Sequence, residues 1–119
     1  MPLRCLLVDD NNAFLEAARV LLEREGVQVA GVASSTAEAL RQARALRPDV
    51  ILVDIRLGQE SGFDLARLLA ADGQDSRAVI LISARAETDY TELIAESPAA
   101  GFLPKSELSA HRISQILNR

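Results

Sequence analysis

The sequence predicts an α/β protein in which one doubly wound, five-stranded parallel sheet is covered by helices on both faces. Two observations predict this class. Short apolar runs recur along the chain, and each is followed by a segment whose apolar residues repeat at helical spacing. The runs are mostly continuous rather than alternating, which is typical of strands buried on both sides. Since 119 residues is the length of one ordinary domain, we expect a single domain over residues 1–119.

Three strands and two helices are expected in the first half of the chain. The strands are LRCLLV (residues 3–8), VQVAGVAS (27–34) and VILV (50–53). The first helix follows Asp10 or Asn11, either of which can cap it, and stops at Gly26. The second helix starts at Ser35 or Thr36. The apolar positions of the two helices are Phe14, Leu15, Ala18, Leu21 and Leu22, then Ala39, Leu40, Ala43 and Leu46.

Two further strands and three helices are expected in the second half. The strands are AVILIS (residues 78–83) and GFLP (101–104). One helix covers residues 63–71 and stops near Gly73, and a weaker one covers residues 88–96. Ser106 is expected to cap the last helix. The buried side of that helix carries Leu108, Ile113, Ile116 and Leu117.

Composition and charge exclude several classes of protein. Apolar residues make up 49% of the chain and charged residues 25%, as in ordinary globular proteins. No apolar run approaches the ~20 residues that span a bilayer, and a net charge of −4 gives no electrostatic footprint for nucleic acid. The N-terminal segment MPLRCLLVDD is a poor signal peptide, and Cys5 is the only cysteine. We therefore expect a reduced, cytoplasmic protein that binds neither membranes nor nucleic acid.

Polar residues stand at the ends of four of the five predicted strands. Asp9 and Asp10 follow the first strand, Asp54 follows the third, Ser83 ends the fourth, and Lys105 follows the fifth. The second strand is followed only by small polar residues, as expected for an edge strand. Because the carboxyl ends of parallel strands meet at one edge of the sheet, we expect the other side chains to converge there.

The chemistry of these residue types favours a metal and a phosphoryl group. Three carboxylates at one rim repel one another unless a cation lies among them or a pKa rises. Hard oxygen ligands suit Mg²⁺ or Mn²⁺, whereas zinc would require a cluster of His or Cys. Lys105 is the only lysine among thirteen basic residues, and Asp54 is a candidate nucleophile for phosphorus. Each residue alone could be a turn former, a helix cap or a solvated side chain, so their joint placement is the informative observation.

Four motifs resemble those of bacterial two-component response-regulator receiver domains, in the same order and over essentially the whole chain. They are LLVDD, VDIRLGQESG, LISA and GFLPK. The resemblance implies the flavodoxin-like, chemotaxis-regulator-like sheet with strand order 2-1-3-4-5. It also implies a phosphoacceptor rather than a turnover enzyme, with a sensor histidine kinase or a phosphotransfer protein as the donor.

The resemblance also assigns roles to the acids. Asp54 would be the phosphorylated carboxylate and one of the ligands of Mg²⁺ or Mn²⁺. Asp10 would contact the metal directly, Asp9 would act largely through water, and the backbone carbonyl of Arg56 would be a further ligand.

The remaining motif residues would form the switch. Ser83 would turn inward to bond the phosphoryl group, Phe102 would follow into the vacated space, and Lys105 would bind the phosphate. The surface formed by the fourth helix, the fifth strand and the last helix would then change. That surface would contact an output domain, a downstream protein or a second copy of the chain.

The sequence departs from the family pattern at two positions. The family often has proline four residues after the phosphoacceptor, where this chain has Gly58. It also often has proline, after a cis bond, directly following the lysine, where this chain has Ser106. That cis bond is therefore in question. Gly62 falls where the family has its loop glycine, and no departure removes a reacting group.

Three other functions are compatible with an acidic residue at the end of a parallel strand. A phosphatase of the haloacid-dehalogenase type needs a second Asp two residues after its nucleophile, and Arg56 stands there. A flavodoxin-like flavin binder needs a hydroxyl-rich and glycine-rich phosphate loop after the first strand, where DDNN would repel phosphate. A receiver-shaped interaction module that works without phosphorylation is the remaining alternative. Its usual mark is the loss of an acid or of the lysine, and the sequence retains both.

Overall fold

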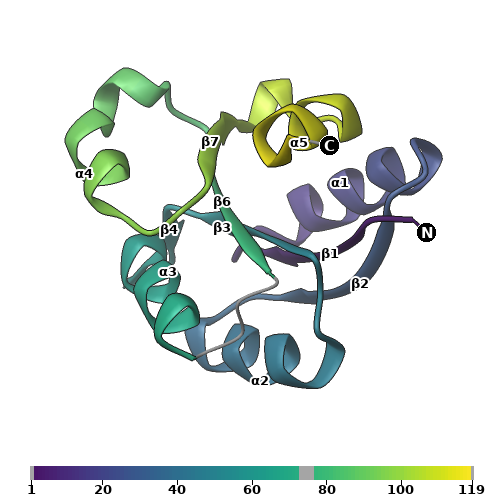
Figure 1. Cartoon of the computed structure of the whole chain (residues 1–119), viewed down its shortest axis with the longest axis horizontal. Coiled ribbons are helices and arrows are strands. Elements are labelled where there is room, and N and C mark those ends of the chain that lie inside the picture. The colour runs from purple at the N-terminus through teal and green to yellow at the C-terminus, as the bar shows by residue number, and fades with distance from the viewer. Residues whose placement is uncertain (1, 73–76, 119) are drawn as a thin grey trace.

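The structure of the chain, a computed structural model, describes residues 2–72 and 77–118 (Figure 1). Five parallel strands form one sheet in the order β2-β1-β3-β6-β7, which is the order 2-1-3-4-5 expected for the five predicted strands. The strands are β1 Arg4–Val8, β2 Gln28–Ala33, β3 Val50–Asp54, β6 Ala78–Ser83 and β7 Gly101–Pro104. Each agrees with its predicted run to within one residue at either end, so the predicted fold class is confirmed.

Helices cover both faces of the sheet. They are α1 Asn12–Arg24, α2 Thr36–Leu46, α3 Gly62–Ala71, α4 Thr91–Glu96 and α5 Ala110–Leu117. Figure 1 shows α1 and α5 on one face and α2 and α3 on the other. Each layer has its own apolar core, so the central strand β3 is buried along its whole length. This two-sided burial is the reason for the continuous apolar runs in the sequence.

Side-chain caps fix the starts of the first two helices. Asn11 Oδ1 accepts a hydrogen bond from the Phe14 backbone N–H at 3.1 Å, so Asn11 rather than Asp10 caps α1. Ser35 Oγ accepts from the Glu38 backbone N–H at 3.2 Å and caps α2 in the same way. The predicted stop of the third helix near Gly73 lies outside the described residues.

The predicted start of the last helix is wrong. Ser106 lies inside a short 3-10 helix, η2 Lys105–Glu107, and α5 begins only after Ser109. Ser109 has the extended backbone that a cap needs, and its Oγ accepts from the Arg112 backbone N–H at 3.1 Å. Within residues 2–72 and 77–118 every peptide bond is trans, including the one that follows Lys105.

The fourth helix is shorter than predicted. Residues 88–96 were expected to be helical, whereas the structure has a 3-10 helix, η1 Glu87–Asp89, followed by the six-residue α4. Tyr90 precedes α4 and supplies no side-chain cap, and no residue of α4 is buried. The first turn therefore lacks the stabilisation that Asn11 and Ser35 give to α1 and α2.

A small hairpin after β3 was not predicted. Its strands β4 Arg56–Leu57 and β5 Glu60–Ser61 pair antiparallel, and Gly58 in the connecting turn has φ +60°. This left-handed conformation favours glycine. The Glu60 carboxylate accepts a hydrogen bond from the Thr36 backbone N–H at 2.8 Å, which joins the hairpin to the start of α2.

The outer edge of β2 is irregular. The register with β1 shifts between Cys5, which pairs with Val29, and Leu6, which pairs with Gly31, so β2 carries one extra residue there. Gln42 Nε2 donates a hydrogen bond to the Val32 carbonyl at 2.7 Å. A backbone group of this edge strand is therefore already occupied by a side chain of α2.

Gly62 permits a close approach between the start of α3 and the end of β3. A Cβ on Gly62 would overlap the Asp54 carbonyl oxygen and would lie 2.9 Å from Ile55 Cα, which are both backbone atoms. A Cβ on Gly101 would instead meet Ile116 Cγ2 at 2.7 Å, which is a side-chain atom and not a backbone atom. The two glycines thus form a matched pair for substitution.

We predict that Gly62→Ala lowers the free energy of unfolding by about 3 kcal/mol, because backbone must move to admit the methyl group. Gly101→Ala should cost less, about 1 kcal/mol, because Ile116 can give way. Urea unfolding of the two variants beside wild type measures both costs. An equal or larger loss for Gly101→Ala would contradict the assignment of Gly62 as a backbone contact.

Candidate functional site

The polar residues predicted to converge do lie at the carboxyl ends of neighbouring strands. Asp9 follows β1, Asp54 is the last residue of β3, Ser83 is the last of β6, and Lys105 follows β7. The strands β1, β3, β6 and β7 are adjacent in that order. The parallel sheet therefore delivers residues that are distant in sequence to one rim.

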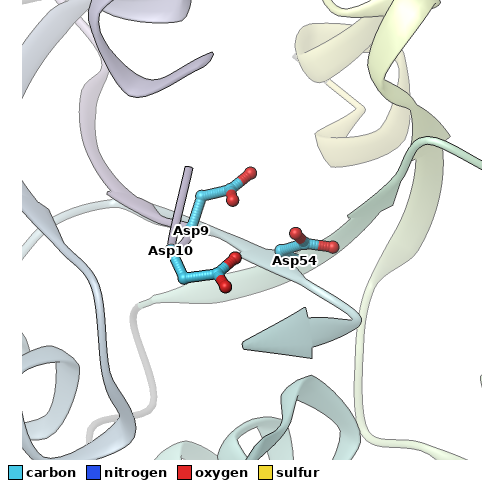
Figure 2. A group of neighbouring side chains, drawn as sticks. All are labelled: Asp9, Asp10 and Asp54. Carbon is cyan, nitrogen blue, oxygen red and sulfur yellow. The ribbon is translucent and has the colours of Figure 1, made fainter. Parts of the chain in front are cut away.

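Three carboxylates form an acidic cluster at this rim (Figure 2). Asp9, Asp10 and Asp54 each offer one oxygen, and these oxygens all lie within 4.8 Å of one another. Asp9 is fully buried, Asp54 is 8% exposed, and Asp10 is exposed. The cluster thus reaches from the interior to the surface, as expected of a site that exchanges a ligand with solvent.

Lys105 holds its ammonium group between two of these carboxylates. Its Nζ lies 2.6 Å from Asp9 Oδ2 and 3.3 Å from Asp54 Oδ2. Burial lowers the pKa of Lys105, but its close contact with Asp9 and its attraction to both carboxylates outweigh burial, so the pKa is raised overall. The side chain therefore remains a cation throughout the ordinary pH range.

The hydrogen-bond partners of the Asp9 carboxylate oxygens indicate whether the cluster can hold a metal. Asp9 Oδ1 accepts a hydrogen bond from the Asn11 backbone N–H at 2.9 Å. Asp9 Oδ2 is buried and has no hydrogen bond of good geometry, so its contact with Lys105 is an ion pair. A buried carboxylate oxygen with spare capacity, in a donor set made only of oxygens, fits a hard divalent cation such as Mg²⁺ or Mn²⁺.

Asp54 is held in a position that disfavours its charged form. Burial and the nearby charge of Asp9 raise the pKa of the Asp54 carboxyl from 3.8 to about 6. The Arg56 backbone N–H, which donates to Asp54 Oδ1 at 3.2 Å, and the Lys105 ammonium act in the opposite direction. The carboxylate therefore stays ionised at neutral pH at a cost in stability.

The other predicted site residues are distributed around this centre. Ser83 is buried, and its Oγ accepts a hydrogen bond from the Arg85 backbone N–H at 3.0 Å. Phe102 is also buried, and it pairs in register with Leu81. Because side chains alternate along a strand, Ser83 and Phe102 lie on the same face of the sheet. Arg56 lies in β4 with an exposed side chain.

One neighbour of the site was missed by the sequence reasoning. Phe14 was assigned to the apolar side of the first helix, but its ring lies under the Lys105 ammonium, with Nζ 4.3 Å from the ring centroid. Helical spacing predicts that such a residue faces the sheet, and it does not distinguish a core ring from a ring at the rim. The place of Phe14 in the first turn of the helix that directly follows the acidic pair Asp9 and Asp10 was the signal available.

Comparison with known proteins identifies the family. The chain matches the family model described as the response regulator receiver domain over residues 5–118. The chain belongs to this family. Receiver domains bind Mg²⁺ at an acidic pocket, and in this chain the acidic cluster is formed by Asp9, Asp10 and Asp54. Response regulators work with histidine kinases and often carry output domains, such as DNA-binding ones.

This receiver domain is similar to a part of longer regulators. It is 30% identical to the response regulator GacA of Pseudomonas viridiflava over 115 residues, which are 96% of this chain and 53% of that protein. It is 33% identical to the DNA-binding response regulator MtrA of Mycobacterium tuberculosis (strain ATCC 25618 / H37Rv) over 105 residues, which are 88% of this chain and 45% of that protein. The chain therefore spans about half the length of these relatives.

The fold agrees with solved receiver structures. The signal receiver domain of NarL from Mycobacterium tuberculosis superposes with a TM-score of 0.84 at 30% identity, over 98% of this chain and 94% of that one. No helix in the described part of this receiver domain is long and apolar enough to cross a membrane.

The raised pKa of Asp54 predicts a pH-dependent gap in stability between wild type and Asp54→Asn. Because the folded pKa of about 6 exceeds the ordinary 3.8, the folded state loses stability as the pH rises through this window. Without metal, Asp54→Asn should be more stable than wild type by about 2 to 3 kcal/mol at pH 7.5, and the gap should close near pH 4.

Chemical denaturation in the presence of a chelator, repeated from pH 4 to pH 7.5, measures this gap. Asp10→Asn is the matched control, because it removes an exposed charge from the same acidic cluster without relieving burial. Its stability gain should be smaller than that of Asp54→Asn. A gap for Asp54→Asn that stays constant over this pH range would contradict the prediction.

Proposed function

We propose that this receiver domain accepts a phosphoryl group on Asp54 from a phosphohistidine of a sensor kinase or of a phosphotransfer protein. The observation that supports this proposal is the position of the Lys105 ammonium, 2.6 Å from Asp9 and 3.3 Å from Asp54, at the carboxyl ends of the strands. Phosphoryl transfer depends mainly on positioning and on electrostatic stabilisation, and the only lysine of the chain supplies a cation beside the nucleophile.

In the proposed reaction a carboxylate oxygen of Asp54 attacks the phosphorus atom. The bond between phosphorus and the imidazole nitrogen breaks, and the nitrogen keeps the electron pair. The nucleophile must be ionised, and a pKa of about 6 leaves most Asp54 side chains ionised at neutral pH. Lys105 stabilises the phosphoryl oxygens through its ammonium, which is close enough to Asp54 to reach them. The domain is thus a phosphoacceptor that assists its own modification rather than a turnover enzyme.

We propose Asp9, Asp10, Asp54 and the backbone carbonyl of Arg56 as the residues that hold Mg²⁺ or Mn²⁺. The bound metal would offset the negative charge that the phosphoryl group brings to the acidic cluster. The proposal is supported by the donor set of oxygens within 4.8 Å of one another, and by the buried Asp9 Oδ2 that lacks a well-directed hydrogen bond.

The aspartyl phosphate would add about two negative charges at the end of β3. We propose that Ser83 then turns towards the phosphoryl group and that Phe102 moves with it, which changes the surface of α4, β7 and α5. Since α4 has no buried residue and no side-chain cap, and contacts the core through the partly buried Ile94, we expect it to be displaced at low cost. Phe102 starts from a buried position in the structure, so its movement would take place within the core.

The changed surface would carry the signal to a partner. Since the chain spans about half of its relatives, we propose that an output domain or a separate downstream protein reads this surface, in the cytoplasm. A second copy of the chain would pair through the same surface of α4, β7 and α5. The net charge of −4 favours assigning any contact with DNA to an output domain and not to this receiver domain.

The first test is phosphorylation itself. Mg²⁺ with acetyl phosphate, or with a phosphorylated histidine kinase, should add one phosphoryl group of about 80 Da, measured as intact mass. Asp54→Asn should abolish the adduct, because it removes the nucleophile. Asp64→Asn should retain it, because Asp64 is an exposed acid on α3 that pairs with Arg67. An adduct in Asp54→Asn would refute the assignment. If wild type forms none with either donor, the domain is an interaction module.

Measurements of Mg²⁺ affinity test the different roles proposed for Asp9 and Asp10 as metal ligands. We predict that Asp10→Asn weakens Mg²⁺ binding about tenfold or more and that Asp9→Asn weakens it less, because Asp9 is expected to act largely through water. Titration calorimetry of both variants, with Asp64→Asn as the control, measures the losses. The order would be refuted if Asp9→Asn proved the more damaging change.

Lys105 should matter more for the switch than for the formation of the adduct. We predict that Lys105→Ala still accepts a phosphoryl group but loses most of the phosphorylation-induced NMR shifts of residues near Ser83 and Phe102, because no second lysine can replace the ammonium. Arg85→Ala, which removes an exposed cation beside Ser83, is the matched control and should keep those shifts. If Lys105→Ala keeps all of the phosphorylation-induced NMR shifts, Lys105 is a solvated surface side chain without a role in the switch.

A further inference from the structure

The Lys105 ammonium has a third neighbour besides the two carboxylates. Its Nζ lies over the face of the Phe14 ring, 4.3 Å from the centroid. The face of an aromatic ring carries negative potential, and a cation within about 6 Å of the centroid is attracted to it. The ammonium is therefore contacted by Asp9, Asp54 and the ring of Phe14.

The ring belongs to a fixed part of the fold. Phe14 lies in the first turn of α1, and its backbone N–H donates to the capping residue Asn11. Its side chain is half-buried and packs against the apolar core on the face of the sheet that α1 and α5 cover. Lys105, in contrast, carries its charge on a long flexible stem. The position of the ring is therefore set by the helix, and the ammonium can adjust to it.

The ring differs from the other two neighbours in one respect. Asp9 and Asp54 both belong to the acidic cluster that is proposed to hold the metal, and Asp54 is the proposed nucleophile. Of the three neighbours of the Lys105 ammonium described above, the Phe14 ring is the one outside this cluster. The contact with the ring can persist when the carboxylates take other partners.

We propose that Phe14 is a positioning residue that keeps the Lys105 ammonium at the rim for the incoming phosphoryl group. The inference rests on the proposed phosphoacceptor function and extends it to a residue on α1. The ring attracts the ammonium without competing for a metal or for phosphorus, and it restricts the conformations of the lysine stem. Without the ring, the ammonium would be free to leave the rim whenever Asp9 and Asp54 engage other partners.

The single lysine makes this inference directly testable. Protein labelled with ¹³C-lysine gives side-chain NMR signals from Lys105 alone. In metal-free wild type, the Lys105 Hε protons should be shifted upfield by the ring, and Phe14→Leu should abolish that displacement. Phe14→Tyr, which keeps an aromatic face, should preserve it. Phe63→Leu is the matched control, since Phe63 contacts Tyr90 and packs in the core cluster on the other face of the sheet.

The second readout is the rate of phosphorylation by acetyl phosphate in saturating Mg²⁺. Phe14→Leu should slow it about two- to fivefold, while the affinity for Mg²⁺ stays within about twofold and Phe14→Tyr restores the rate. Site-specific replacement of Phe14 by fluorinated phenylalanines should lower the rate progressively as fluorine withdraws electron density from the face. A packing role would not follow this gradation, because ring shape changes little.

These outcomes separate the inference from the function on which it rests. If the Lys105 signals are the same in wild type and in Phe14→Leu, the ring does not position the ammonium and the inference is wrong. It is also wrong if the signals change but wild type and Phe14→Leu are phosphorylated at the same rate. If wild type accepts no phosphoryl group from acetyl phosphate or a kinase, the proposed function fails, while the Lys105 signals still decide whether Phe14 positions the lysine.

Discussion

The ion pairs that Lys105 makes with Asp9 and Asp54 are the interaction on which the site depends. Burying two carboxylates side by side is unfavourable, because each loses water and repels the other. One ammonium, from Lys105 directly after the edge strand β7, compensates both at once, at 2.6 and 3.3 Å. The compensation is incomplete, since the pKa of Asp54 remains raised to about 6. The folded chain thus retains an excess of negative charge at the position where a divalent cation would be accommodated.

The rest of the fold holds Asp9, Asp54 and Lys105 close to one another. Parallel pairing places the ends of β1, β3, β6 and β7 side by side, and Gly62 lets α3 start directly against the backbone of Asp54. On the opposite face, the Glu25 carboxylate at the end of α1 accepts a hydrogen bond from the Ala110 backbone N–H at 2.7 Å. This bond ties the start of α5 to α1, so the Lys105 segment is anchored on both sides. The helix α4 has no buried residue and no side-chain cap from Tyr90, and its Ile94 packs against the core cluster that contains Phe102.

Sequence patterns were sufficient for the sheet and for the residues at its rim, because buried parallel strands leave continuous apolar runs and the rim follows from strand ends. They failed where neighbouring residues compete for one role. Ser106 and Ser109 are chemically equivalent caps, and only the backbone after Lys105 decides between them. The hairpin at Gly58 has strands of two residues, too short for any periodicity. Phe14 carried the same apolar signal as the core residues around it, so its contact with Lys105 depended on tertiary structure.

The irregular edge at β2 bears on how the domain behaves at high concentration. A regular edge strand exposes a row of N–H and C=O groups on which a strand of another molecule can assemble. In this chain the extra residue opposite Cys5 and Leu6 interrupts that row, and Gln42 occupies the Val32 carbonyl. Edge-to-edge aggregation through β2 is thereby disfavoured, even though the Val32 side chain is 39% exposed. Copies of the domain would therefore associate through surfaces made of side chains. A conformational change can alter the affinity of such surfaces for one another.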